Sequence, residues 1–193
     1  MKIVGLTGGI GSGKTSILNL FKKNNIKCFN SDLIAKDLME NDLKDKIKIL
    51  FGSEIYPKGK LNRKKISDIV FNNREKLSLL NSTVHPEVRK KFKNFIKTNE
   101  KDKILVCETA LLFETGFYKK CDFTILVIAP FQKRIERIIQ RDNLLESEII
   151  KRMEHQWSDK KKANLSDHII NNDNWKDTLL QFDNLFKKLN LYY

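Results

Sequence analysis

The feature that most restricts the fold of this chain is a glycine-rich stretch near its amino terminus. Residues 8–15 read Gly-Gly-Ile-Gly-Ser-Gly-Lys-Thr and match the pattern G-x-x-x-x-G-K-[ST] at every fixed position. An apolar run at residues 2–7 precedes the stretch, and Ile17, Leu20 and Phe21 follow it at helical spacing. A strand, a glycine-rich turn and a helix in this order predict a phosphate-binding loop on a parallel α/β sheet.

Each residue type in this loop suits the binding of phosphate. Glycine tolerates positive φ angles and lets backbone N–H groups converge on phosphate oxygens, and the helix that begins near Gly13 adds the positive end of its dipole. Lys14 is expected to reach the β- and γ-phosphates of ATP, and the Thr15 hydroxyl to ligate Mg²⁺. The expected nucleotide-binding residues of the loop are Gly8, Gly9, Ile10, Gly11, Ser12, Gly13, Lys14, Thr15 and Ser16.

Other apolar runs of strand length recur along the chain. They lie at residues 26–30, 103–108, 123–129 and, with a weaker pattern, 168–171. Continuous apolar runs suit parallel strands that are covered on both faces. Helical patterns fill the intervals, and two of them follow Pro86 and Pro130, where proline fits the first turn of a helix. We therefore predict an α/β, three-layer P-loop NTPase fold with a five-stranded, mainly parallel sheet.

The strand runs are unevenly spaced, which predicts how the single P-loop domain is organised. No strand pattern is evident between residues 31 and 102, so we interpret about 35–100 as a helical substrate-binding insertion. The stretch 131–165 is dense in Arg and Lys and is interpreted as a helical lid. The predicted core then comprises about 1–34, 101–130 and 166–193.

Composition limits the ligands and the cellular setting. The net charge is +13 with a pI of about 9.6, which favours anionic ligands, but the excess is spread along the chain. No apolar stretch approaches the roughly 18 residues of a membrane-spanning helix, and no secretory pattern is seen. Three cysteines (Cys28, Cys107 and Cys121) and three histidines lack metal-ligand spacing, so reduced buried thiols are expected. We expect a cytoplasmic monomer with no membrane and no nucleic-acid partner.

The rest of the sequence narrows the class of P-loop protein. It holds no NKxD guanine-reading motif and no DxxG switch motif, which disfavours a GTPase, and 193 residues are few for a motor ATPase. A small-molecule kinase needs elements that close over an acceptor and exclude water, as the insertion and lid would. Three alternatives stay open: a kinase for a nucleotide, nucleoside or sugar acid, a nucleotide-responsive nucleic-acid-binding protein, and a degenerate kinase that binds ATP without turnover.

An ordered set of short motifs resembles the dephospho-CoA kinase family from about residue 2 to residue 173. The motifs are Gly5–Thr15, Asn30-Ser31-Asp32, His85-Pro86, Leu111–Glu114, Gln140-Arg141-Asp142, Gln156 and Ser166–Asn172. The resemblance implies transfer of the γ-phosphoryl group of ATP to the ribose 3′-hydroxyl of dephospho-CoA, giving CoA and ADP in the last step of coenzyme A biosynthesis. Two positions depart from the family's pattern: Asn30 stands where Asp is usual, and Ala110 where Pro is usual.

Two candidate catalytic residues lie outside the loop. Asp32 follows the second predicted strand, where it would orient the acceptor hydroxyl or accept its proton; the alternative is that it caps a helix over residues 33–39. Arg134, Arg137 and Arg141 recur at helical spacing, and a solvated basic face is the ordinary interpretation of such a run. The family motif favours Arg141 as the phosphate-binding residue and leaves the other two undecided.

Three further residues are candidates for contacts with the substrates. Glu108 ends an apolar strand in the manner of a Walker-B carboxylate, so it would act on Mg²⁺ or the acceptor, or be merely solvated. His85 would contact dephospho-CoA or serve the structure alone. Asn172 would lie near adenine, with an Asx-turn as the competing interpretation.

Overall fold

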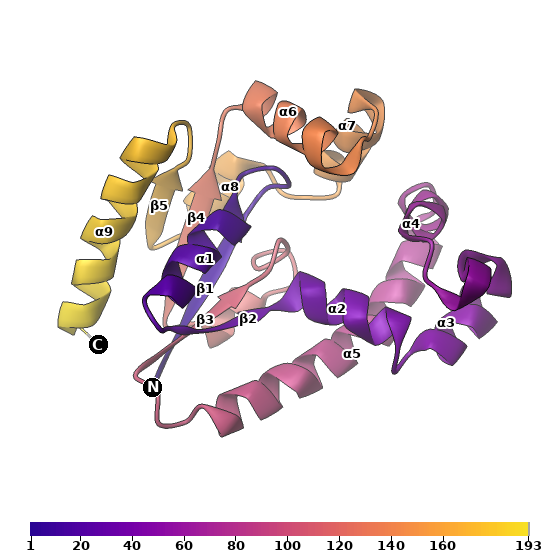
Figure 1. The fold of residues 1–193 in the computed structure, drawn as a ribbon, viewed down its shortest axis with the longest axis horizontal. Coiled ribbons are helices and arrows are strands. Elements are labelled where there is room, and N and C mark those ends of the chain that lie inside the picture. Colours follow the sequence, from indigo (N-terminus) through magenta and orange to yellow (C-terminus); the bar gives the residue numbers. More distant parts are fainter. Residues whose placement is uncertain (193) are drawn as a thin grey trace. The chain divides into compact units, whose positions relative to one another are not determined.

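The computed structural model describes residues 1–192 and the side chains of residues 1–189. It contains one five-stranded parallel sheet among these residues (Figure 1). The strand order is β2-β3-β1-β4-β5, and every neighbouring pair is parallel. The strands are β1 (Lys2–Gly8), β2 (Lys27–Asn30), β3 (Ile104–Glu108), β4 (Phe123–Ile128) and β5 (His168–Asn171). This confirms the predicted fold class, and each strand boundary lies within one residue of its prediction.

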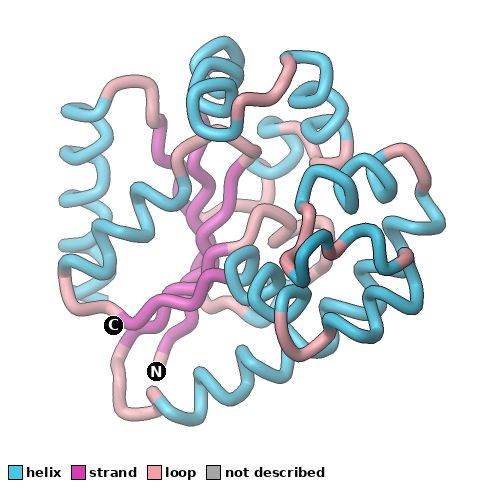
Figure 2. Tube along the Cα trace, turned by 45° about the vertical axis from the view of Figure 1, so that its right-hand side comes forward, coloured by secondary structure: helices cyan, strands magenta, loops and turns pink. Residues whose placement is uncertain are grey.

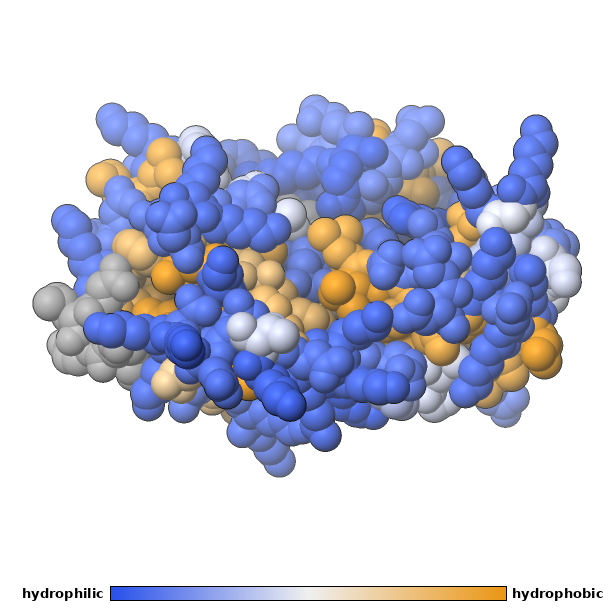
Figure 3. Space-filling model, turned by 60° about the horizontal axis from the view of Figure 1, so that its bottom comes forward, coloured by the Kyte–Doolittle hydropathy of each residue, from blue (hydrophilic) through white to orange (hydrophobic). Residues whose placement is uncertain are grey.

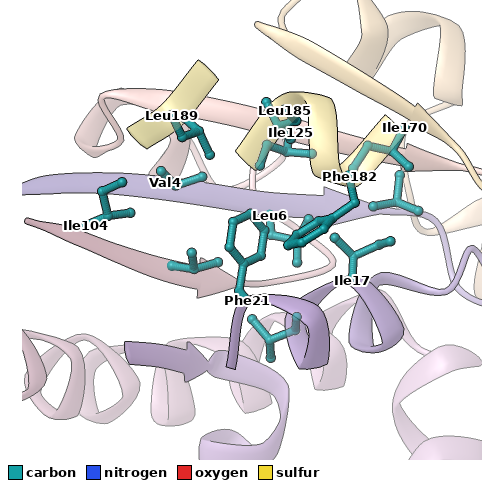
Figure 4. Close-up of a cluster of buried hydrophobic side chains, with 13 residues drawn as sticks. Val4, Leu6, Ile17, Phe21, Ile104, Ile125, Ile170, Phe182, Leu185 and Leu189 are labelled. Carbon is teal, nitrogen blue, oxygen red and sulfur yellow. The ribbon is translucent and has the colours of Figure 1, made fainter. Parts of the chain in front are cut away.

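Two helices bury their apolar sides against one face of this sheet. They are α1 (Lys14–Lys23) and α9 (Trp175–Tyr192). Phe21 of α1 and Phe182 of α9 meet edge to face with ring centroids 4.9 Å apart, above Leu6 of β1, as the close-up in Figure 4 shows. All three side chains are essentially inaccessible to solvent. Burial of such side chains contributes about 1.5–3 kcal/mol each, so this cluster fixes the helix that follows the phosphate loop.

The other face of the sheet is covered by the segment that follows β3 and by a short helix. Gly5 of β1 leaves room for Leu112 and Cys121, because a Cβ atom at Gly5 would lie 2.9 Å from each of those side chains. The helix α8 (Asp159–Ala163) packs against β4. The segment also contains the 3-10 helix η3 (Phe117–Lys120). The sheet is therefore enclosed between two layers.

Two more helices precede α8 in the predicted lid region. They are α6 (Phe131–Asp142), which begins directly after Pro130 as expected, and α7 (Glu146–Glu154). Ile135 and Ile138 of α6 pack with Ile149 of α7 in a small separate core. The prediction that these helices act as a lid concerns motion and stays a prediction.

The chain divides into two compact units, Met1–Asn30 with the chain from Asn99 onward, and Ser31–Thr98. The second unit is helical, as the tube in Figure 2 makes plain, and none of its described residues forms a strand. It has its own hydrophobic core, in which Leu38, Ile47 and Ile55 are fully buried. Its elements are α2 (Ser31–Glu40), α3 (Lys44–Phe51), η1 (Ser53–Ile55), η2 (Pro57–Gly59), α4 (Arg63–Phe71) and α5 (Arg74–Thr98).

The prediction that Pro86 lies in the first turn of a helix is wrong. Pro86 lies inside the 25-residue helix α5. A proline there cannot donate to the carbonyl of Ser82, yet the helix continues because Val84 and Phe92, on either side of the proline, are both buried. The start of α2 also differs from the expected range 33–39, because Ser31 and Asp32 already belong to the helix.

No helix of the described chain is long and apolar enough to cross a membrane.

Candidate active site

The carboxyl ends of the parallel strands place the phosphate loop and three polar residues along one edge of the sheet. The loop 9–13 follows β1, Asn30 ends β2, Glu108 ends β3, and Asn172 follows β5. In open parallel sheets this edge is where ligands bind. The strand register puts Asn30 beside Glu108 and Glu108 beside Leu6 of the central strand.

The loop has the backbone conformation that a phosphate cradle requires. Gly11 and Gly13 have φ angles of 79° and 91°, in the left-handed region that favours glycine. Gly13 stands directly before α1, and its carbonyl accepts from the amides of Ser16 and Ile17. The first N–H groups of α1 therefore point toward the loop with the positive end of the helix dipole behind them.

Lys14 lies folded over this loop. Its side chain is largely buried, with a relative exposure of 8%, and its ammonium group donates to the carbonyl of Gly9 at 3.1 Å. The ammonium group is thus held against the loop itself, and its contact with the β- and γ-phosphates of a nucleotide stays a prediction.

Thr15, Glu108 and Asn30 form a connected polar group beside the loop. The Thr15 hydroxyl donates to Glu108 Oε1 at 3.0 Å, and the Asn30 amide donates to Glu108 Oε2 at 2.6 Å. Glu108 is only 2% exposed, so the interpretation of this residue as a merely solvated strand end is wrong. A buried carboxylate that accepts hydrogen bonds on both oxygens is held in one orientation.

Two arginines of α6 hold the loop, and the sequence pattern had left their roles undecided. Arg134 donates from Nε to the carbonyl of Ile10 at 2.9 Å and from Nη1 to Asp159 at 3.0 Å, and it is 9% exposed. Arg137 donates to the carbonyl of Asn172 at 3.0 Å and to that of Gly11 at 3.4 Å. Arg134 and Arg137 are three residues apart, so they lie on the same side of a helix. This spacing is the sequence signal that could have identified them as residues that contact the loop.

Asn172 joins the last strand to the loop. Its side-chain amide donates to the carbonyl of Ser12 at 2.8 Å, and its Oδ1 accepts from the Thr178 hydroxyl at 3.1 Å. The side chain approaches the Cα of Gly13 so closely that a Cβ atom there would collide with it. Asn172 therefore braces the phosphate loop, a contact that neither the adenine nor the Asx-turn interpretation foresaw.

Two residues between α7 and the end of α8 complete the surroundings of the loop. The side-chain oxygen of Gln156 accepts from the Ile10 amide at 2.8 Å. Lys162 is fully buried, and its ammonium group lies 2.9 Å from Glu114 Oε1 and 3.1 Å from the carbonyl of Ala110. Lys162 thus ties α8 to the segment after β3.

Arg141 makes different contacts from those of Arg134 and Arg137. It is on the surface with its side chain 63% exposed, and its guanidinium group donates twice to Asp142. That hydrogen bond raises the pKa of Arg141 above its ordinary value. The prediction that Arg141 binds phosphate therefore rests on the sequence motif alone and stays a prediction.

Asp32 and His85 both belong to the helical unit. Asp32 is exposed and lies in the first turn of α2. Its carboxylate therefore interacts favourably with the positive end of the helix dipole. His85 is half-buried in α5; burial lowers its pKa below the ordinary value, the charge of Arg89 lowers it further, and Asp32 opposes the shift. The two acceptor-side candidates therefore interact electrostatically, while their roles stay predictions.

The described residues hold no group of three or more His, Cys, Asp and Glu side chains that could hold a metal ion. The Thr15 hydroxyl, in the first turn of α1, and the Glu108 carboxylate bring two side-chain oxygens together at 3.0 Å beside the phosphate loop. Such oxygens suit Mg²⁺, which is often bound by one or two protein groups together with phosphates.

A complete phosphate loop on a parallel sheet, with basic residues packed against it, places the protein in the class of P-loop nucleotide-binding proteins. The comparisons with known proteins narrow this class. The sequence model of dephospho-CoA kinase matches residues 2–177, and the chain belongs to the dephospho-CoA kinase family. The dephospho-CoA kinase of Fusobacterium nucleatum is 37% identical over 190 residues, covering 97% of this chain and 94% of that protein.

Two solved structures are similar over nearly the whole chain. The crystal structure of TT1252 from Thermus thermophilus has a TM-score of 0.85 at 29% identity and covers 97% of both chains. Dephospho-CoA kinase from Campylobacter jejuni has a TM-score of 0.69 at 25% identity and covers 97% of this chain and 96% of its own.

Proposed function

We propose that this protein transfers the γ-phosphoryl group of ATP to the ribose 3′-hydroxyl of dephospho-CoA, giving CoA and ADP, the last step of coenzyme A biosynthesis. The observation that carries the proposal is the family match over residues 2–177 on a chain whose phosphate loop is intact. Dephospho-CoA and ATP are the substrates.

Positioning and charge neutralisation supply most of the rate in such a transfer, because the protein performs little covalent chemistry. The amides of residues 9–16, the dipole of α1 and the ammonium group of Lys14 would stabilise the phosphates that gain charge in the transition state. Arg134 and Arg137 keep the loop in shape through its carbonyl groups. Arg141 is proposed to join them on the transferred phosphate, as the family motif implies.

The residues present fit a magnesium ion. The Thr15 hydroxyl donates a hydrogen bond to Glu108 Oε1, and the lone pairs of its oxygen are then available to a cation. When bound, the ion would neutralise charge on the β- and γ-phosphate oxygens. We propose Thr15 as its protein ligand, with Glu108 as the group that orients Thr15.

On the acceptor side, Asp32 is proposed to align the 3′-hydroxyl and accept its proton, and His85 to contact dephospho-CoA. Asp32 is exposed in the first turn of α2, so its carboxylate is accessible to a substrate hydroxyl. The neutral form of His85 is favoured by its surroundings, so it would act as a hydrogen-bonding group rather than as a cation.

The proposal also places the protein in the cytoplasm as a monomer, without a nucleic-acid or membrane partner. Sedimentation at several protein concentrations tests the monomer, and a salt-titrated binding assay on random-sequence DNA and RNA tests the missing nucleic-acid partner.

The decisive experiment measures ADP release from ATP·Mg²⁺ with and without dephospho-CoA, with nucleoside monophosphates and shikimate as parallel acceptors. We expect release that depends on dephospho-CoA, together with CoA as the product. If another acceptor stimulated ADP release instead, dephospho-CoA would be the wrong acceptor, but the protein would still be a kinase. If no acceptor stimulated ADP release, the result would indicate a protein that binds ATP without turnover.

A further inference from the structure

The inference concerns Asn30, the position where this chain departs from the pattern Asp-x-Asp of the family it resembles. Asn30 is the last residue of β2, and β2 pairs with β3 so that Asn30 stands directly beside Glu108. The two residues are 78 positions apart in the sequence. Parallel strand pairing, rather than a local turn, therefore brings the two side chains together at the binding edge of the sheet.

The contact between these side chains depends on one being an amide and the other a carboxylate. Asn30 Nδ2 donates to Glu108 Oε2 at 2.6 Å, a short distance for a hydrogen bond to a charged acceptor. Glu108 is 2% exposed, and a carboxylate this deeply buried needs donors in order to keep its charge. The amide supplies one donor and adds no charge of its own.

An aspartate at position 30 would turn the attraction between this side chain and Glu108 into a repulsion. Two carboxylates with oxygens at such a separation repel each other, and they share a site only when one of them takes up a proton. Either the two side chains would move apart or one negative charge would be lost. In both cases Glu108 would leave the orientation in which its other oxygen accepts a hydrogen bond from the Thr15 hydroxyl.

We propose that Asn30 is a positioning residue: it holds the Glu108 carboxylate so that Glu108 in turn aims the Thr15 hydroxyl at the cation of the bound nucleotide. This rests on the proposed kinase function. The side chains of residue 30 and Glu108 must together carry one negative charge. We therefore expect the family's usual aspartate at position 30 to lower the activity of this protein.

The first test compares Asn30→Asp with the wild type in the dephospho-CoA assay. We expect kcat to fall about 10–100-fold, the range found when a residue that orients a metal ligand is lost. The KM for dephospho-CoA is expected to stay within about twofold, because the change acts on the nucleotide side. Wild-type turnover by the Asn30→Asp variant would overturn the proposal.

The swapped variant Asn30→Asp with Glu108→Gln separates positioning from mere structural damage. The glutamine amide can donate to the new carboxylate while its oxygen accepts from Thr15, so both hydrogen bonds and the single charge are restored. We expect kcat at least tenfold above that of Asn30→Asp alone. No recovery in a swapped protein that is folded, as judged by its thermal unfolding, would contradict the proposal.

A surface pair provides the matched control. Asn174 donates to Asp177, and both side chains are exposed, so Asn174→Asp makes the same chemical change at a surface pair that has no proposed role in the reaction. We expect normal turnover from this variant.

ATP affinity keeps the proposal testable if dephospho-CoA is not the acceptor. We expect Asn30→Asp to weaken binding of ATP with Mg²⁺ by at least threefold and binding of ATP with EDTA by less than half that factor. Equal losses in both conditions would overturn the positioning role. A wild type without dephospho-CoA activity would overturn the proposed function alone.

Discussion

Lys14 is almost completely buried, and its ammonium group is held by a carbonyl of the loop itself. If Lys14 binds phosphate as proposed, its charge is already fixed beside the loop before any nucleotide binds. We expect Lys14→Ala to lower kcat by about 10²–10³-fold, as when one preorganised donor is removed. The measurement is steady-state turnover with saturating ATP. Lys22→Ala, at an exposed position of the same helix, is the control and keeps its activity. Turnover at the wild-type rate by Lys14→Ala would refute the role of Lys14.

The arginines of α6 pose a second question at the residue scale. Arg134 binds the loop and Asp159, whereas Arg141 binds its neighbour Asp142. Hydrogen bonds from a charged group contribute about 1.5–3 kcal/mol, so we expect Arg134→Gln to raise the KM for ATP about tenfold or more. Arg141→Gln, measured beside it, is expected to lower kcat and leave that KM nearly unchanged. An Arg134→Gln variant with the wild-type KM for ATP would show that the bracing of the loop by α6 is dispensable.

At the scale of the elements, one buried ion pair fastens α8 to the segment after β3. Lys162 is fully buried and Glu114 has a side-chain exposure of 12%, so removing one partner leaves a buried charge without its counterpart. We expect Lys162→Met to destabilise the fold by about 3–5 kcal/mol, measured by urea unfolding. Lys162→Met combined with Glu114→Leu should lose less than the single variant. Lys160→Met, an exposed change in the same helix, is the control; a Lys162→Met protein as stable as this control would contradict the prediction.

The elements that follow local patterns were predictable from the sequence. The five strands and the phosphate loop depend on runs of adjacent residues, and their predictions are confirmed. The course of α5 through Pro86 was not predictable in this way, because burial of Val84 and Phe92 overrides the preference of proline for a helix start. Local preference is a weak guide where packing on both sides favours a continuous helix.

The contacts within the site were the least predictable part. Asn30 meets Glu108 only because β2 and β3 are neighbours in the sheet. Arg134 and Arg137 meet the loop only because β4 lies beside β1 and directs α6 over the loop's carbonyl groups. The sequence indicated residue types and strand ends, but the order of strands decides which of them touch.

At the scale of the whole molecule, the two half-buried histidines predict how stability depends on pH. Burial lowers the pKa of His85 in one unit and of His168 in the other, with further lowering by Arg89 and Lys188. Each histidine therefore binds a proton more tightly in the unfolded chain, where its pKa is about 6.5. The stability that the neutral histidines supply is present above pH 6.5 and is lost as the pH falls below that value.

The double variant His85→Gln with His168→Gln isolates this contribution. Its urea-unfolding midpoint should fall less steeply than that of the wild type between about pH 7.5 and 5.5, since carboxylates titrate equally in both proteins. Identical slopes would show that neither histidine is coupled to folding.

The net charge of +13 predicts how the protein captures its two anionic substrates. Hydrophilic side chains cover most of the face drawn in Figure 3, and a field from many surface charges speeds the approach of anions when salt is low. The Debye length shrinks from about 30 Å at 0.01 M salt to about 10 Å at 0.1 M. We therefore expect the association rate constant of dephospho-CoA, measured by stopped flow, to fall about tenfold across this range, while kcat at saturating substrate changes little. The control is sucrose added to the low-salt buffer until its viscosity matches that of the high-salt buffer. An association rate that is independent of ionic strength would mean that the positive charge is a property of the composition, with no part in substrate capture.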